Sequence, residues 1–283
     1  YNIKKGVENM ELFVTDLDGT LINKDRQVTK KSEEIINELI KSGMNFTVAT
    51  ARTPATAVEI LQNLDLKLPV ALMNGVLIYD TKELRYIDIK DINIESTYKI
   101  LDIFEKYNKN PLVYGIVDNH LWVYHKEFEH AYEYNFYKER ADKELKTFVK
   151  ISNYKESVLK SSIINFVAFD EYEKIKSIAE EIEKIEGINV NYYKDVYEDC
   201  YFLEAYSSEA SKANGIKYLS KYINYKNVIC FGDNLNDIPM FELANEAYAT
   251  ANATEEVKKI ATGVIGSCEE EGVAEFLKER FQN

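Results

Sequence analysis

Short apolar runs alternate with amphipathic stretches over the first ninety residues. Apolar runs of four or five residues that end in turn residues are typical of buried strands, and apolar residues at helical spacing are typical of the helices that cover them. Strands separated by helices of this length predict parallel, right-handed βαβ units. The expected elements are strands at 11–15, 46–49 and 70–73, helices from Thr29 to about Gly43 and from Thr53 to Leu64, and a hairpin over 76–89.

The last quarter of the chain resumes this alternation of strands and helices. It therefore predicts a return to the same parallel α/β core. The expected elements are strands at 227–231, 246–250 and 264–265, and helices at about 209–222, 236–244, 254–261 and 270–280.

The segment between these two parts has longer helical stretches and strands that include aromatic residues. It predicts an α+β domain over 91–206, inserted into a core formed by 10–90 and 207–283, with crossings near 90 and 207. The expected helices are 95–107, 126–140 and 171–185, and the expected strands are 112–116, 120–124, 162–169, 188–193 and 201–206.

Composition excludes several classes of protein. The chain has 283 residues, of which 46% are apolar and 12% aromatic, and this excludes a disordered protein. No apolar run approaches the roughly 18 residues of a membrane helix, and the start has no apolar signal core. Met10 would be a natural initiator, so residues 1–9 are expected to be an extension, and the sequence leaves open whether it is native. Three cysteines lack metal-ligand spacing, so we expect reduced thiols, with Cys230 buried, and a cytoplasmic location.

The formal net charge of −13 argues against nucleic acid and anionic membrane as partners, because both need a basic footprint. An anionic substrate would instead need a local positive site within an acidic surface. A bound cation and a nearby lysine would supply it.

The first candidate site follows the predicted strand 11–15. Asp16 and Asp18 stand two residues apart, so in extended chain they point to one side, at the strand's carboxyl edge where open α/β sheets bind ligands. Two close carboxylates need a shared proton or a cation, and Mg²⁺ takes one or two carboxylates together with phosphate oxygens. The alternative is that the acids only cap a turn.

A second acid cluster follows the predicted strand 227–231. Asp233 and Asp237 come after Gly232, and Pro239 stands where a helix would begin. Taken alone, this segment is typical of a capped turn between a strand and a helix. Two such clusters at strand ends in one chain are harder to explain by capping.

Together, the segments DLDGTL at 16–21 and GDNLNDIPM at 232–240 resemble the haloacid dehalogenase-like phosphohydrolases of the Cof type. The resemblance covers nearly the whole chain and implies a Rossmann-like parallel-sheet core with an inserted α+β cap of the C2B type. Thr50, Lys212 and the Asn74-Gly75 turn stand where the family has its other motifs. Ala51 and Ala213 replace glycines that the family usually has, so the resemblance leaves the substrate scope open.

The resemblance also implies roles for these residues. Asp16 would be the nucleophile that forms an aspartyl phosphate, and Asp18, with its carboxyl group free, would be the general acid and base. The Asp16 carboxylate, the Asp18 carbonyl and the Asp233 carboxylate would bind Mg²⁺. Asp237 would steady Lys212 or a metal-bound water. Further residues would contact the substrate: Thr50, Lys212 and Asn236 at the phosphoryl group, with Asn74 nearby. Arg52 would either contact the substrate or form an ion pair that faces the cap, and the sequence leaves both alternatives open.

The expected activity is hydrolysis of a small phosphorylated metabolite, such as a sugar phosphate. A phosphomutase or phosphotransferase is the alternative within the same superfamily, and a metabolite sensor without turnover is the alternative outside enzymes. A response-regulator-like phosphoacceptor would need only one compact domain and no inserted cap, so the length of this chain counts against that alternative. Nothing in the chain predicts an oligomeric state.

Two features of the inserted segment allow structural and functional interpretations. The aromatic run 132–140 either packs a helix on its sheet or lines a substrate wall. His120, His125 and His130 recur every five residues, a spacing that fits neither one strand face nor one helix face, so we expect them at the surface.

Overall fold

The computed structural model describes residues 10–194 and 199–282, so the predicted extension 1–9 lies outside the described residues. The chain divides into two compact units: one contains the residues up to Asp88 and from Ser211 onward, and the other contains 89–210. The assignment of 91–206 as a cap domain, with core segments 10–90 and 207–283, stays a prediction.

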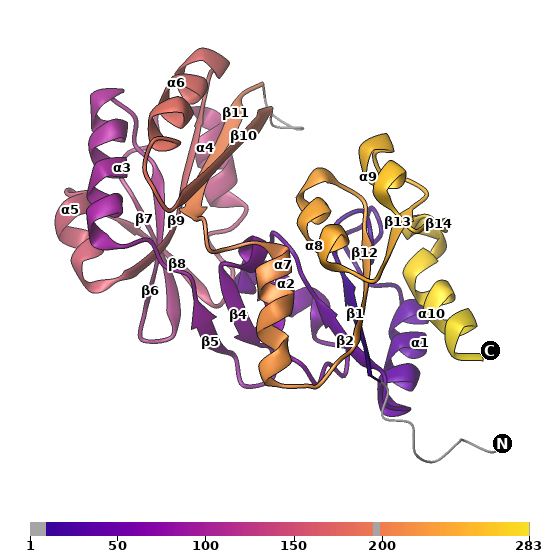
Figure 1. Ribbon diagram of the computed structural model, residues 1–283. Helices are drawn as coiled ribbons and strands as arrows, with labels where there is room; N and C mark the ends of the chain where they lie inside the picture. Colours follow the sequence, from indigo (N-terminus) through magenta and orange to yellow (C-terminus); the bar gives the residue numbers. More distant parts are fainter. Residues whose placement is uncertain (1–9, 195–198, 283) are drawn as a thin grey trace. The chain divides into compact units, whose positions relative to one another are not determined.

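The first unit is built on a parallel sheet of five strands in the order β14-β13-β12-β1-β2 (Figure 1). The chain leaves β1 toward β2 and later returns to the other side of β1, which creates a topological switch point between β1 and β12. The strands are β1 Glu11–Thr15, β2 Asn45–Val48, β12 Asn227–Gly232, β13 Glu246–Thr250 and β14 Gly263–Ile265.

Helices cover both faces of this sheet, which explains why its strands are apolar runs without alternation. Phe13 and Phe231 contact Phe281 and Phe276 of α10 on one face. On the other face, residues of β1 and β12 form a buried cluster with residues of α7 and α8. The helices of this unit are α1 Lys30–Lys41, α2 Pro54–Leu61, α7 Lys212–Tyr218, α8 Ile238–Leu243, α9 Glu255–Ile260 and α10 Gly272–Gln282.

A small antiparallel sheet extends the edge of the core. It contains β3 Val70–Leu72, β4 Leu77–Asp80 and β5 Arg85–Ile89, in that order. A parallel bridge between Ala49 and Ala71 joins it to the end of β2. The predicted hairpin over 76–89 is therefore confirmed.

The second unit has a mixed sheet in the order β10-β11-β9-β6-β7-β8, in which only β7 and β8 run parallel. Helices α3, α5 and α6 pack on one face around Phe104, Phe166 and Ile178. The elements are α3 Ile94–Lys106, β6 Leu112–Val117, β7 His120–His125, α4 Ala131–Lys138, β8 Lys146–Lys150, α5 Tyr154–Ser157, β9 Ser162–Asp170, α6 Tyr172–Ile182, β10 Ile188–Lys194 and β11 Tyr201–Ser207. The predicted fold class, a parallel α/β core with an inserted α+β domain, is confirmed.

Several predicted helices have wrong boundaries, and three of them show why. The helix expected over 126–140 begins only at Ala131, because the Glu133 carboxylate accepts hydrogen bonds from the backbone N–H groups of Glu129 and His130 and starts the helix there. The helix expected from 209 begins at Lys212, after a Ser211 cap. The helix expected to reach Leu64 ends at Leu61. The sequence analysis also missed β8 and α5.

The aromatic run of the insertion packs on its own sheet. Tyr132 and Phe136 of α4 contact Phe169 of β9, and Tyr137 contacts Phe148 of β8. These contacts favour the structural interpretation of that run.

The expectation of three surface histidines is wrong for His125. This residue is buried, and its ring stacks on Phe128 at a centroid distance of 4.7 Å. Its Nδ1 atom lies 2.7 Å from the backbone carbonyl oxygen of Lys126.

None of the helices in the described parts of the chain is both long and apolar enough to cross a membrane.

Candidate active site

The candidate site lies at the carboxyl ends of β1 and β12, which are neighbours in the core sheet. Thr15 pairs with Phe231 at the end of the ladder, and the Asp16 backbone N–H donates to the Phe231 carbonyl at 2.9 Å. Asp16 and Asp233 therefore begin the two loops that leave the sheet at its topological switch point. The strand pairing thus unites two acid clusters that are 217 residues apart, counted as 233 minus 16.

Lys212 links these clusters through its ammonium group. Its Nζ atom lies 2.8 Å from Asp16 Oδ1 and 2.6 Å from Asp237 Oδ1. Lys212 is 1% exposed and Asp237 is fully buried. The second oxygen of Asp237 accepts the backbone N–H groups of Asp233 at 2.9 Å and Asn234 at 3.0 Å. The network is buried and paired, as burying charges in a protein requires.

Burial disfavours the charged form of the carboxyl groups here. It raises the pKa of Asp16 to about 7, although Lys212 pulls in the opposite direction. Burial and the nearby Asp237 also raise the pKa of Asp233 to about 6. The pKa of Lys212 is raised: burial opposes its charge, but the Coulombic attraction of Asp16 and Asp237 outweighs that effect. One lysine thus compensates only part of the local negative charge.

A tight turn brings Asp233 close to the loop after β1. Thr20 Oγ1 donates to Asp233 Oδ1 at 3.0 Å, and Gly19 has φ +71°. A β-carbon on Gly19 would lie only 2.3 Å from Asp233 Oδ2. The turn therefore requires glycine for its backbone conformation and for its close approach to the carboxylate.

The acid groups fit a divalent cation. Asp16, Asp233 and Asp237 each offer one carboxylate oxygen, and these atoms lie within 4.8 Å of one another. Oxygen donors of this kind are what Mg²⁺ prefers. Burial raises the pKa of both Asp16 and Asp233, so it disfavours their charged forms, and the positive charge of a divalent ion would stabilise those forms.

The Asp18 carboxyl group, which was expected to stay free of the metal, is paired with Arg52. Arg52 Nε and Nη2 each donate to a different oxygen of the Asp18 carboxylate, at 2.6 Å in both cases. This bidentate pair forms because the loop after β2 lies beside the loop after β1, so the two side chains reach each other across 34 residues of sequence.

The remaining predicted residues lie on neighbouring loops of the same unit. Thr50 is buried directly after the bridge residue Ala49, and its Oγ1 accepts the Arg52 backbone N–H at 3.3 Å. Asn74 has φ +54°, and its Oδ1 accepts from Asn236 Nδ2 at 3.3 Å. The Asn74–Asn236 contact joins two residues that were predicted separately.

The sequence analysis missed Thr20 as a residue that positions Asp233. The signal was present, because a threonine directly after Asp18-Gly19 stands in the same turn as the acids. It also missed Asn252, whose side chain donates to the Gly19 carbonyl at 2.8 Å. No local pattern marks that contact, since it spans 233 residues.

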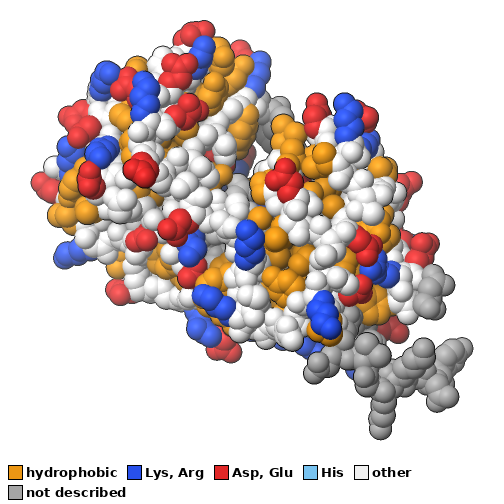
Figure 2. Space-filling view, viewed as in Figure 1, with side chains coloured by type: hydrophobic (Ala, Val, Ile, Leu, Met, Phe, Trp, Pro, Cys, Tyr) orange, Lys and Arg blue, Asp and Glu red, His pale blue; other side chains and the backbone are white. Residues whose placement is uncertain are grey.

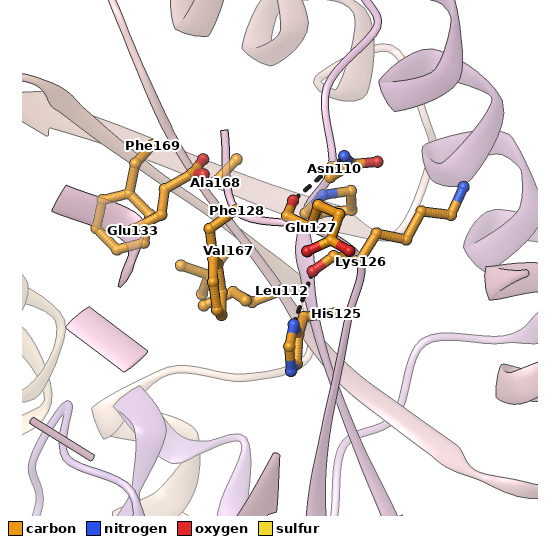
Figure 3. Close-up of a pocket in the computed structure, with 11 residues that line it drawn as sticks. Asn110, Leu112, His125, Lys126, Glu127, Phe128, Glu133, Val167, Ala168 and Phe169 are labelled. Carbon is orange, nitrogen blue, oxygen red and sulfur yellow. Dashed lines mark hydrogen bonds between the residues drawn. The ribbon is translucent and has the colours of Figure 1, made fainter. Parts of the chain in front are cut away.

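A separate pocket lies within the inserted unit and includes none of the predicted site residues. Its wall combines apolar side chains such as Phe128, Val167 and Phe169 with His125 and Glu133 (Figure 3). Glu133 also pairs with the buried ammonium group of Lys109.

On the face shown in Figure 2, basic and acidic side chains are interspersed rather than segregated.

Comparisons with known proteins agree with this arrangement. The model of a family described as haloacid dehalogenase-like hydrolase matches residues 13–277. A putative phosphatase of Buchnera aphidicola subsp. Schizaphis graminum is 29% identical over 275 residues, which cover 95% of each chain. The 5-amino-6-(5-phospho-D-ribitylamino)uracil phosphatase YitU of Bacillus subtilis is 25% identical and covers 95% of this chain and 97% of its own.

Among solved structures, the HAD subclass IIB sugar phosphatase BT4131 has a TM-score of 0.71 at 19% identity. The match covers 95% of this chain and 98% of that chain. At this identity the likeness shows the fold, including the inserted domain of the C2B type.

Proposed function

Because this chain belongs to the haloacid dehalogenase-like hydrolase family and is a phosphatase of that family, we propose that it hydrolyses small organic phosphate monoesters through an aspartyl phosphate on Asp16. The observation that carries this proposal is the buried contact of Lys212 with both Asp16 and Asp237 at the end of β1. A carboxylate held beside a buried ammonium group, with other acids close by, suits a nucleophile directed at an anionic phosphoryl group.

In the first step, an Asp16 oxygen attacks phosphorus while the bond to the ester oxygen breaks. Lys212 holds the Asp16 carboxylate in place and offsets negative charge on the transferring group. Thr50 and Asn236 are the proposed hydrogen-bond donors to the phosphoryl oxygens, since both lie on loops beside Asp16 in the same unit. Asp237 keeps Lys212 in position by accepting its hydrogen bond.

Asp18 is the proposed proton donor to the leaving oxygen. In the second step it takes a proton from the water that hydrolyses the aspartyl phosphate, which regenerates Asp16. Dividing the reaction in this way replaces one difficult displacement by two easier ones.

The proposed ligands of Mg²⁺ are the Asp16 and Asp233 carboxylates and the Asp18 carbonyl, with Asp237 beside them. When bound, the ion would neutralise charge on the phosphoryl oxygens. Thr20 orients Asp233 for this role by donating to its Oδ1.

The substrate class is proposed from the relatives. One relative is named for a phosphorylated ribitylamino compound, and one structural neighbour is described as a sugar phosphatase. Both names point to phosphate esters of small polyhydroxy metabolites. The proposed phosphoryl-binding residues Thr50, Lys212 and Asn236 support this class through the phosphate group that its members share.

The test is phosphate release from a panel of metabolite monoesters, including sugar phosphates, with Mg²⁺ and after exhaustive chelation. We expect turnover with Mg²⁺, negligible turnover after chelation, and none with Asp16→Asn, which should keep the fold. Free phosphate that accumulates with time distinguishes hydrolysis from transfer to a sugar acceptor. Undiminished hydrolysis by Asp16→Asn would contradict the covalent mechanism.

A further inference from the structure

The ion pair between Arg52 and Asp18 conflicts with the chemistry proposed for Asp18. Both oxygens of this carboxylate accept short hydrogen bonds from one guanidinium group, at 2.6 Å each. To donate a proton to a leaving group, Asp18 must first be a neutral carboxylic acid, and a neutral acid no longer forms an ion pair with the guanidinium group. Asp18 must therefore part from Arg52 before it can act.

The two members of the pair differ in burial, and the more buried one lies beside the proposed phosphoryl site. The Arg52 side chain is 18% exposed, whereas the Asp18 side chain is 55% exposed. The Arg52 backbone N–H contacts Thr50 Oγ1, the hydroxyl proposed for the phosphoryl site, and its carbonyl accepts the Met73 N–H at 3.0 Å. The backbone of Arg52 is thus anchored beside that site, and its side chain is the more buried member of the pair.

An arginine in this position is suited to exchange one oxyanion for another. Its planar fork matches phosphate as well as carboxylate, with five N–H donors in fixed geometry. Asp18 uses two of these N–H groups. A phosphate ester arriving near Thr50 therefore finds a guanidinium group within the same loop.

We propose that Arg52 is a positioning residue that holds Asp18 away from the reaction until an oxyanion of the substrate takes over its guanidinium group. Binding of the phosphate ester then releases Asp18 for proton transfer. This inference rests on the proposed function. It adds that substrate binding itself switches on the acid–base group, so that the ion pair competes with the substrate for Arg52.

Competition of this kind is measurable without turnover by a double-mutant cycle on anion binding. The probe is inorganic phosphate, titrated calorimetrically in buffer with Mg²⁺ against four proteins: the unchanged chain, Asp18→Asn, Arg52→Met, and the double variant. Asp18→Asn should tighten phosphate binding about fivefold or more when Arg52 is present, because the guanidinium group is then free. In the Arg52→Met background the same change removes only a negative charge, and its effect should be clearly smaller.

Two results would overturn the proposal. An equal effect of Asp18→Asn in both backgrounds would mean that Arg52 does not bind the anion. A smaller effect with Arg52 present would mean that Asp18 prepares Arg52 for the anion rather than competing with it. Circular dichroism of all four proteins checks folding. If Arg52→Met fails to fold, Arg52→Lys replaces it in the cycle, because it keeps the charge but loses the bidentate fork.

A kinetic measurement separates a positioning role from a merely structural one. Arg52→Lys should raise KM for an alkyl phosphate substrate more than it lowers kcat, since the exchange partner in the substrate complex is weakened. A fall of kcat with unchanged KM would contradict the exchange of Asp18 for a substrate oxyanion at Arg52. Asp25→Asn, an exposed acid in the same loop region, is the matched control and should change neither the cycle nor the kinetics. Because phosphate binding is measured without catalysis, an absence of phosphatase turnover would count against the proposed function and not against this competition.

Discussion

Replacing Lys212 by methionine tests the idea that a buried cation holds the acid cluster together. Methionine fills similar space without the charge, so the variant leaves Asp16 and Asp237 buried with no cation beside them. Lys212 now contacts both carboxylates, at 2.8 and 2.6 Å. Removing one partner of a buried charged network typically costs about 3–5 kcal/mol of folding free energy. We expect a loss of that size in metal-free protein at pH 8.

The loss should depend on pH in a defined direction. Burial raises the pKa of Asp16 in the folded protein to about 7, above its ordinary value of 3.8. Its unfavourable contribution to folding therefore builds up as the pH rises from 3.8 to about 7, where the unfolded chain has lost a proton that the folded protein still binds, and stays constant above that range. Lys212 lowers the pKa of Asp16, so its removal raises that pKa further. The destabilisation should be largest at pH 8 and should shrink toward pH 5, where Asp16 takes up a proton and needs no cation.

The assay is thermal unfolding followed by circular dichroism, with chelator present and at several pH values. For a unit of about 150 residues, 3–5 kcal/mol corresponds to a fall in Tm of roughly 6–20 °C. Lys217→Met is the matched control, because Lys217 is exposed on the same helix α7. It should change stability by less than about 0.5 kcal/mol. If Lys212→Met at pH 8 behaved like this control, or lost more stability at pH 5 than at pH 8, the reasoning from buried charge would be refuted.

Three further predictions concern the metal, the turn and the acid. Mg²⁺ affinity should rise between pH 5 and 8, because the raised pKa values of Asp16 and Asp233 make protons compete with the ion. Calorimetry in buffers of different ionisation enthalpy measures both the affinity and the number of protons released. An affinity that does not change with pH would contradict the prediction. Gly19→Ala should lower Mg²⁺ affinity about tenfold or more, because its β-carbon would meet Asp233 Oδ2. Gly43 also has a positive φ, of +103°, but a β-carbon there would have nothing within 4 Å. Gly43→Ala should therefore cost only about 1–2 kcal/mol of stability and leave Mg²⁺ affinity unchanged. Equal effects of the two substitutions on Mg²⁺ affinity would argue against a role of the turn. Asp18→Asn should reduce hydrolysis of alkyl phosphates far more than that of p-nitrophenyl phosphate, whose leaving group needs little protonation; equal losses would speak against an acid role.

Sequence patterns predicted the core well because its strands are buried on both faces. The run ELFVT at 11–15 coincides with β1, and 246–250 coincides with β13. Boundaries were less accurate where a single side chain decides them. Glu133 and Ser211 start their helices by accepting hydrogen bonds from backbone N–H groups. Nearby residues have a similar propensity to cap a helix, so the sequence does not show which of them does so. The missed β8 pairs with β7 through backbone contacts that its own polar sequence does not indicate.

The sequence by itself determined which chemical groups stand at the ends of the strands. Asp16, Asp18, Asp233 and Asp237 were evident from their spacing, and Lys212 from the order of motifs. Only the tertiary structure decided how these groups pair. It placed Lys212 against Asp16, Thr20 against Asp233, and Arg52 against Asp18, an ion pair that the sequence did not specify. The physical reason is that the strength of an ion pair or hydrogen bond changes when the distance between its two atoms changes by an ångström or less, and that it also depends on burial. Both the distance and the burial are set only when distant segments pack together.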